Sequence, residues 1–184
     1  MILLAITPGQ GFEPQAWRQV LRSGVDGFMI REKQMPTGAL LGAARWCQDT
    51  APEVELWVGG RLDVALASGC GLHAPEVYPE IEPGLLPLSR PLHTETQWPA
   101  RMQAEQLLIS PILPSPGKGK PWGLARLHQF LDSLPVGGPR LLALGGLDPG
   151  SVRALAHPRL AGLAAIRPFW TGEPERAVAA FRRE

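Results

Sequence analysis

The sequence has little cysteine, almost no net charge and no long apolar segment, and each shortage excludes a class of protein. Its 184 residues include two cysteines, Cys47 and Cys70, which form no metal-binding spacing, and so small a number is typical of a reduced compartment. A net charge of +1 provides no basic surface of the kind that binds nucleic acid. The apolar segment Met1–Ile6 is far too short to span a membrane and lacks the basic start of a targeting peptide. We therefore expect a cytoplasmic protein with neither a nucleic-acid nor a membrane partner.

What the sequence does have is a recurrence of short apolar runs. Many of these runs stop at a glycine, a histidine or a charged residue. Runs without polar alternation are typical of parallel strands that are buried on both faces. The eight runs are Ile2–Ile6, Gly27–Ile30, Val54–Val58, Gly71-Leu72, Leu86–Leu92, Leu107–Ile109, Leu141–Leu144 and Leu160–Ile166. They predict a (β/α)₈ barrel, or TIM barrel, in which the chemistry lies at the carboxyl ends of the strands.

The length of the chain adds a constraint on this α/β fold. A chain of 184 residues suits a single domain but is short for such a barrel, for which about 250 residues are typical. We therefore expect one domain over residues 1–184 in which some helices are shortened. The crowding is greatest between Val54 and His93, where three strands leave little room for full helices.

Helical spacing of apolar residues fills most of the gaps between the runs. The predicted helices are Glu13–Arg22, Gly38–Cys47, Arg61–Ala67, Thr94–Met102, Leu124–Leu134, Gly150–Ala156 and Glu173–Arg183. The helix over residues 94–102 is weak because Pro99 interrupts it. We expect Asp148 to cap the helix that begins at Gly150, because aspartate followed by proline is a typical helix start.

The residues that follow the runs resemble those of a known family. The matching segments occur in the family's order: Leu4–Pro8, Ile30–Lys33, Arg61–Ala65, Gly71–His73, Ser110–Lys118 and Leu142–Leu147. Each motif is short, but together they are specific and span nearly the whole chain. On these residues the chain resembles the thiamine phosphate synthase/TenI family, whose members are small (β/α)₈ proteins of thiamin biosynthesis.

The resemblance implies one of two activities. Synthases of the family join a hydroxymethylpyrimidine diphosphate to a thiazole phosphate and expel pyrophosphate. TenI-type members aromatise a thiazole carboxylate phosphate tautomer by a proton shift and need no metal. Because both types bind a thiazole phosphate, the resemblance implies a small-molecule thiazole phosphate ligand for this chain.

The synthase chemistry requires Mg²⁺, which prefers carboxylate ligands. The family's Asn-Asp pair is replaced here by Gly59-Gly60, and residues 74–78 contain Glu76 but no aspartate where the family has its second metal ligand. The family's two threonines near the lysine are reduced to Ser115 and Gly117. These departures favour the tautomerase, so we expect no metal and no cofactor, and Mg²⁺ only if the protein is a synthase.

The group that would move the proton has to be found among the histidines. TenI-type members have a histidine at the sixth strand, where this chain has Ser110-Pro111 as in the synthases. His73 and His93 both end predicted strands, and imidazole accepts and donates protons near neutral pH. We therefore consider His73 and His93 the candidate catalytic residues. His128 and His157 fall on a helix and at a helix end, where a structural role is more typical.

A phosphate site is predicted after the seventh and eighth runs, where barrels of this kind often bind phosphate. Gly145 and Gly146 leave backbone N–H groups bare for an anion. Arg167 would add a bidentate contact, but the family has a small residue there, so Arg167 could instead fill the phosphate site. The resemblance adds four candidate substrate-binding residues: Arg31, Lys33, Ser115 and Lys118.

Three interpretations therefore follow from the sequence. The favoured one is a TenI-like, metal-independent thiazole tautomerase. The others are a divergent thiamine phosphate synthase and a catalytically silent or regulatory barrel that binds a phosphate ligand. The sequence leaves the natural substrate and the oligomeric state open, a homo-oligomer included.

Overall fold

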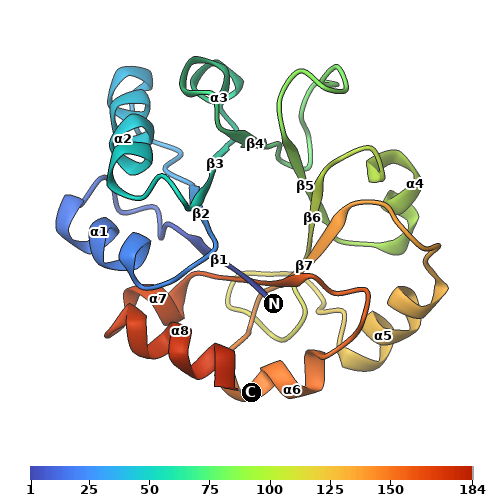
Figure 1. Ribbon diagram of the computed structural model, residues 1–184. Coiled ribbons are helices and arrows are strands. Elements are labelled where there is room, and N and C mark those ends of the chain that lie inside the picture. The colour runs from blue at the N-terminus through green and yellow to red at the C-terminus, as the bar shows by residue number, and fades with distance from the viewer. Residues whose placement is uncertain (184) are drawn as a thin grey trace.

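The computed structural model describes residues 1–183 and has a closed barrel of eight parallel strands. Figure 1 looks along the barrel and shows the strands as a ring inside a layer of helices. The strands pair in chain order, and β8 closes the ring by pairing with β1. The strands are β1 (Ile2–Ile6), β2 (Gly27–Ile30), β3 (Glu55–Gly59), β4 (Gly71–His73), β5 (Leu88–Leu92), β6 (Gln106–Ile109), β7 (Arg140–Leu144) and β8 (Gly162–Ala165). The predicted (β/α)₈ fold is confirmed.

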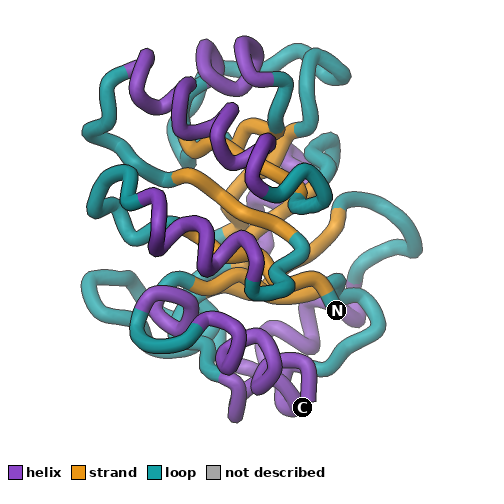
Figure 2. The backbone as a smooth tube through the Cα atoms, turned by 60° about the vertical axis from the view of Figure 1, so that its left-hand side comes forward, coloured by secondary structure: helices purple, strands orange, loops and turns teal. Residues whose placement is uncertain are grey.

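Helices lie around the outside of the strands (Figure 2). They are α1 (Pro14–Arg22), α2 (Thr37–Thr50), α3 (Leu62–Ser68), α4 (Trp98–Arg101), α5 (Leu124–Ser133), α6 (Val152–Leu155), α7 (Arg167–Trp170) and α8 (Pro174–Arg183), with 3₁₀ turns η1 (Glu95–Gln97) and η2 (Pro149–Ser151). The predicted helix over residues 94–102 is divided into η1 and α4. Pro99 lies in the first turn of α4, where a missing N–H breaks no helical hydrogen bond.

The strands bury side chains on both faces, which explains why their sequences do not alternate. Outward-facing residues pack under the helices in one core, which includes Phe28, Val58, Leu72, Leu107 and Leu163. Inward-facing residues fill the barrel in a second core: Leu4, Ile6, Met29, Trp57, Leu108, Leu142 and Ala164. The barrel is therefore packed solid below its mouth, as is typical of this fold.

Trp57 has the largest side chain of the inner core. Trp57 is fully buried, and an ideal Cβ on Gly71 would lie 2.4 Å from its ring. The two residues are neighbours across the β3–β4 ladder. Glycine at position 71 is thus a packing requirement, because any side chain there would displace the indole.

The connections between β3 and β5 are short, as the length of the chain predicts. The helix between β3 and β4 is only α3, of seven residues, and it ends at Gly69 in the left-handed conformation. Residues 74–87, between β4 and β5, contain no helix. Tyr78, Ile81 and Leu86 of this proline-rich loop, here called the β4–β5 loop, pack against the outer core where other connections have a helix.

The start of the sixth predicted helix follows the expected capping pattern. The Asp148 carboxylate accepts a hydrogen bond of 3.0 Å from the N–H of Ser151, and Pro149 occupies the first turn. Within residues 1–183, no helix is long and apolar enough to cross a membrane.

Candidate active site at the barrel mouth

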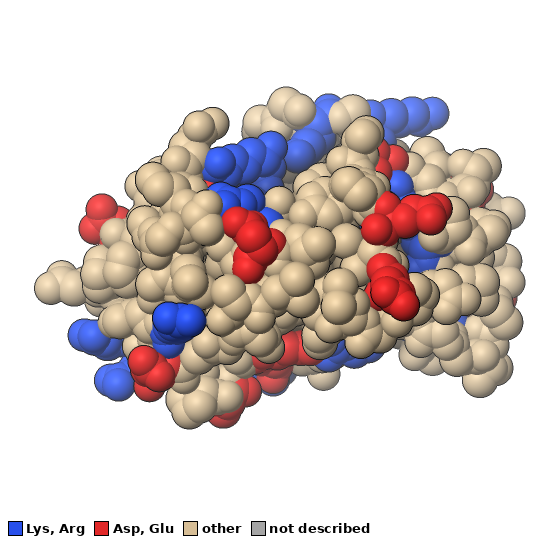
Figure 3. All heavy atoms as spheres, turned by 90° about the horizontal axis from the view of Figure 1, so that it is seen from above, with Lys and Arg blue, Asp and Glu red and all other residues tan. Residues whose placement is uncertain are grey.

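The carboxyl ends of the strands meet at one end of the barrel, which we call the mouth. In Figure 3 this end lies at the upper edge, where lysine and arginine side chains gather. The structure places seven of the nine predicted site residues at a strand end or within three residues after it: Arg31, Lys33, His73, His93, Gly145, Gly146 and Arg167. Ser115 and Lys118 lie farther out, in the loop between β6 and α5.

The side of the mouth after β1 and β2 holds a hollow of about 690 Å³, lined by residues 8–11 and 31–36. The two segments that line the hollow are joined by Glu32. Its buried carboxylate accepts hydrogen bonds from the N–H groups of Gly9 (3.0 Å) and Gly11 (2.7 Å). Because both carboxylate oxygens are occupied, Glu32 is a structural clamp. Arg31 and Lys33 line the hollow, and no side chain within residues 1–183 pairs with them.

His73 ends β4 and is half-buried in the mouth. Its Nδ1 lies 2.9 Å from the hydroxyl oxygen of Ser89 on β5. Burial, and next the positive charge of Arg31, lowers the pKa of His73 from its ordinary 6.5 to about 4. His73 is therefore neutral at pH 7, and it is a poor acceptor of protons.

His93 follows β5 and is exposed. Its Nδ1 lies 2.7 Å from the carbonyl oxygen of Ser110, and its Nε2 lies 3.2 Å from a carboxylate oxygen of Glu76. Both ring nitrogens thus face acceptors, and only the doubly protonated ring can donate to both. His93 is therefore bound to the protein at both ring nitrogens, and one of these oxygens must release its nitrogen before that nitrogen can contact a ligand.

Glu76 is the one acidic residue that the sequence places near the metal position of the synthases. Its carboxylate accepts a hydrogen bond of 2.9 Å from Arg101, and it also binds Gln97 and His93. The family's other metal ligands are replaced by Gly59-Gly60, which carry no donor side chain. Within residues 1–183, no three His, Cys, Asp or Glu side chains are grouped to hold a metal ion. The residues present do not fit a Mg²⁺ site.

Gly145 and Gly146 have φ angles of +101° and +71°, a region that favours glycine. An ideal Cβ would lie 3.0 Å from Pro111 at position 145 and 2.8 Å from Leu113 at position 146. The glycines are thus required by close packing against the β6–α5 loop, which is a reason that the sequence did not show. No carbonyl or side chain in the described chain accepts from the N–H groups of Gly146 and Leu147, so two backbone donors are available there.

The remaining predicted residues, Arg167, Ser115 and Lys118, lie in the segments that follow β8 and β6. Arg167 is exposed at the start of α7, and its guanidinium has no acceptor among the described residues. The N–H of Lys118 donates to the Ser115 carbonyl (3.1 Å), which closes a tight turn. The Lys118 side chain is exposed. The structure does not bring Lys118 into contact with the strand-end residues.

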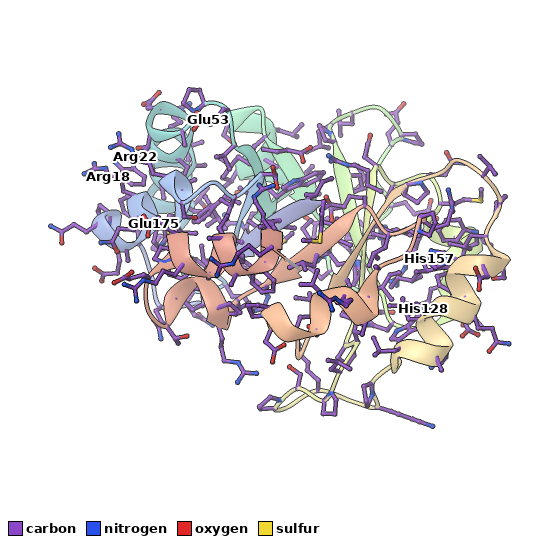
Figure 4. The ribbon with its side chains drawn as sticks, turned by 60° about the horizontal axis from the view of Figure 1, so that its bottom comes forward. Arg18, Arg22, Glu53, His128, His157 and Glu175 are labelled. Carbon is purple, nitrogen blue, oxygen red and sulfur yellow. The ribbon has the colours of Figure 1, made fainter. Side chains whose placement is uncertain are left out.

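Two further histidines lie together away from the mouth, on α5 and before β8 (Figure 4). The rings of His128 and His157 are 5.6 Å apart. The Nδ1 of His157 accepts from the N–H of Arg159, and its Nε2 lies 3.1 Å from Asp132. This pattern fixes a structural role for His157.

The fold and the mouth define the class of protein: a small (β/α)₈ barrel with cationic side chains, two histidines and free backbone donors at the carboxyl ends of its strands. A family model described as thiamine monophosphate synthase matches residues 3–169. The chain therefore belongs to this family of thiamin metabolism, which also includes the TenI-type proteins, and the resemblance of its motifs is confirmed. No curated protein matches the sequence.

Solved structures show the same fold. A thiamine phosphate pyrophosphorylase from Pyrococcus furiosus is 22% identical, with a TM-score of 0.85 over 99% of this chain and 94% of that one. A thiamine phosphate pyrophosphorylase from Bacteroides thetaiotaomicron is 12% identical, with a TM-score of 0.74 over 100% and 96%. The 3-keto-L-gulonate-6-phosphate decarboxylase from Vibrio cholerae is 13% identical, with a TM-score of 0.69 over 99% and 96%. At such identities the likeness concerns the fold alone.

Proposed function

We propose that this protein binds a thiazole phosphate at the mouth and acts as a metal-independent thiazole tautomerase. The observation that carries the proposal is the state of Glu76. Its carboxylate is occupied by Arg101, Gln97 and His93, and glycines stand where the family has its other metal ligands. Such a mouth is poorly suited to expelling pyrophosphate, whose developing charge is normally neutralised by Mg²⁺. An isomerisation that moves only a proton needs no such ion.

The phosphate of the ligand is proposed to bind the free N–H groups of Gly146 and Leu147, with Arg167 adding a charged contact. Backbone donors after the seventh strand of a barrel are a frequent phosphate site. In this proposal Arg31 and Lys33 face the opposite end of the ligand from the hollow after β1 and β2. Ser115 and Lys118 contribute only if the β6–α5 loop moves inward.

The two histidines are proposed to have different roles. The pKa of about 4 for His73 leaves it three units below pH 7, which costs about 4 kcal/mol for accepting a proton there. His93 is the proposed proton shuttle, because its ring is exposed at the mouth and release of Glu76 would free Nε2 to contact the ligand.

The proton shift then balances without a co-reactant. The His93 imidazolium gives a proton to one end of the ligand's conjugated system, and the neutral ring takes the proton from the ring carbon at the other end. The C–H electron pair enters the ring and makes it aromatic. The enzyme ends in the form in which it began, and Glu76 holds the imidazolium at the start and at the end.

A second candidate function is the synthase, which the comparisons and one sequence motif favour. The family model and the pyrophosphorylase structures both carry that description, and this chain has Ser110-Pro111 at the sixth strand as the synthases do. The experiment must therefore include the synthase substrates with Mg²⁺.

The test is turnover of the thiazole carboxylate phosphate tautomer by the wild type, His93→Ala and the control His128→Gln. We expect a loss of about 10²–10⁴-fold in kcat for His93→Ala, the usual contribution of acid–base catalysis, with little change in KM. The control should retain full activity because His128 lies away from the mouth. Full activity of His93→Ala would exclude this shuttle. Mg²⁺-dependent formation of thiamin phosphate would establish the synthase instead. Ligand binding without any turnover would favour the third interpretation, a catalytically silent barrel that binds a phosphate ligand.

A further inference from the structure

Three polar side chains lie in a row beside the apolar core of the barrel interior. They are His73 on β4, Ser89 on β5 and Gln106 on β6. His73 pairs with Ser89 across one strand ladder, and Ser89 pairs with Gln106 across the next. Ser89 is 0% exposed and Gln106 is 1% exposed. Buried polar groups of this kind must satisfy their hydrogen bonds within the protein.

The hydrogen bonds of the row have one consistent direction. The Gln106 amide nitrogen lies 3.4 Å from the Ser89 hydroxyl oxygen and can only donate to it. The Ser89 hydroxyl, which accepts this bond, still needs an acceptor for its own proton. The acceptor within reach among the described residues is Nδ1 of His73, at 2.9 Å. With Nδ1 accepting, the proton of a neutral His73 ring must be on Nε2.

The Nε2 atom of His73 reaches open space in the mouth. No residue in the described chain binds it, and it is not among the buried unpaired atoms. The Arg31 side chain, from the end of β2, starts beside this part of the barrel: its Cγ lies 3.7 Å from an ideal Cβ on Gly59, which pairs with His73 across the β3–β4 ladder. A ring N–H and a guanidinium therefore face the same part of the mouth, and both are donors only.

We propose that Ser89 and Gln106 are positioning residues that hold His73 in its neutral Nε2–H form, so that His73 and Arg31 together bind an anionic oxygen of the ligand. The chemical class that this pair selects is a carboxylate on the ligand's ring, since two donors suit two acceptor oxygens and exclude an amine. The carboxylate assignment rests on the proposed thiazole ligand, whereas the assignment of the ring tautomer does not. His73 would touch the ligand, and Ser89 and Gln106 would act through it.

The tautomer can be measured without any ligand by ¹⁵N NMR of histidine-labelled protein at pH 7. The wild type should show a pyridine-type Nδ1 and a pyrrole-type Nε2 for His73, with the assignment made by the loss of these signals in His73→Gln. Ser89→Ala should populate the opposite tautomer, because no donor then faces Nδ1. Ser89→Thr keeps the hydroxyl and should restore the wild-type signals. Ser133→Ala, on α5, is the matched control. A pyrrole-type Nδ1 in the wild type would overturn the proposal.

The ligand assignment is tested by comparing thiazole carboxylate phosphate with thiazole phosphate, which lacks the carboxylate. We expect the wild type to prefer the carboxylate ligand by about 10–100-fold in Kd, the usual range for charge-assisted hydrogen bonds. Ser89→Ala should lose about tenfold of this preference while its affinity for thiazole phosphate is unchanged. Equal Kd values for the two ligands in the wild type would contradict the carboxylate site. Failure of the wild type to bind either ligand would overturn the proposed function and the ligand assignment, while the nitrogen signals would still decide the tautomer.

Discussion

Lowering the pH should destabilise this protein through His73. Its pKa is about 4 in the folded protein and 6.5 when unperturbed, because burial and the charge of Arg31 oppose protonation. The charges of Arg90 and His93 act in the same direction. Between pH 6.5 and 4, His73 is therefore protonated in the unfolded chain but largely neutral in the folded protein. Above pH 6.5 His73 does not change the free energy of unfolding. As the pH falls from 6.5 toward 4, the free energy of unfolding decreases. With about 1.4 kcal/mol for each pH unit, the loss is at most about 2 kcal/mol at pH 5 and about 3 kcal/mol at pH 4.

The assay is urea unfolding of the wild type and His73→Gln at pH 7, 6 and 5. Carboxylates also titrate in this range, but they do so in both proteins, so the difference between the two free energies of unfolding isolates His73. We expect this difference to shift by up to about 2 kcal/mol between pH 7 and pH 5, in favour of the variant. His128→Gln serves as the control for loss of a histidine outside the mouth. Parallel pH profiles for the wild type and His73→Gln would refute the lowered pKa.

The other predictions concern packing, capping and the phosphate site. Gly71→Ala should destabilise the protein by about 1–3 kcal/mol in urea unfolding, because its Cβ meets the Trp57 ring, and Trp57→Leu should recover part of the loss. An equal loss in both backgrounds would contradict this packing. Asp148→Ala should cost about 1 kcal/mol in the same assay through loss of the cap, and an unchanged midpoint would argue against it. Arg167→Gln should weaken binding of inorganic phosphate without changing stability, whereas unchanged affinity would place the phosphate elsewhere.

The fold was predictable because strands that are buried on both faces have short apolar sequences without polar alternation. Central parallel strands such as β2 and β6 consist of apolar residues alone or nearly so, and each ends where a polar residue reaches the mouth. The shortened helices between β3 and β5 followed from the spacing of the runs. The division of residues 94–102 into two short turns did not, since Pro99 can either break a helix or begin one.

The candidate site was predictable in its positions but not in its contacts. Strand ends in a barrel share one mouth, so His73 and His93 could be placed there from the sequence. Their partners come from register and loop conformation. Ser89 lies inside an apolar run, and only its pairing with His73 shows that it faces the interior. Glu76 reaches His93 through the fold of the β4–β5 loop, which no local pattern encodes. The packing of Gly146 against Leu113 depends on a loop from another strand.

The most direct test of a metal-independent thiazole phosphate site is equilibrium binding by calorimetry. Thiazole phosphate, thiazole carboxylate phosphate and pyrophosphate would each be titrated into the wild type with Mg²⁺ and with a chelator. We predict that both thiazole ligands bind with the same affinity in the two buffers, and that pyrophosphate binds weakly in both. Binding of the thiazole ligands only with Mg²⁺, or tight Mg²⁺-dependent binding of pyrophosphate, would contradict the account and favour a synthase.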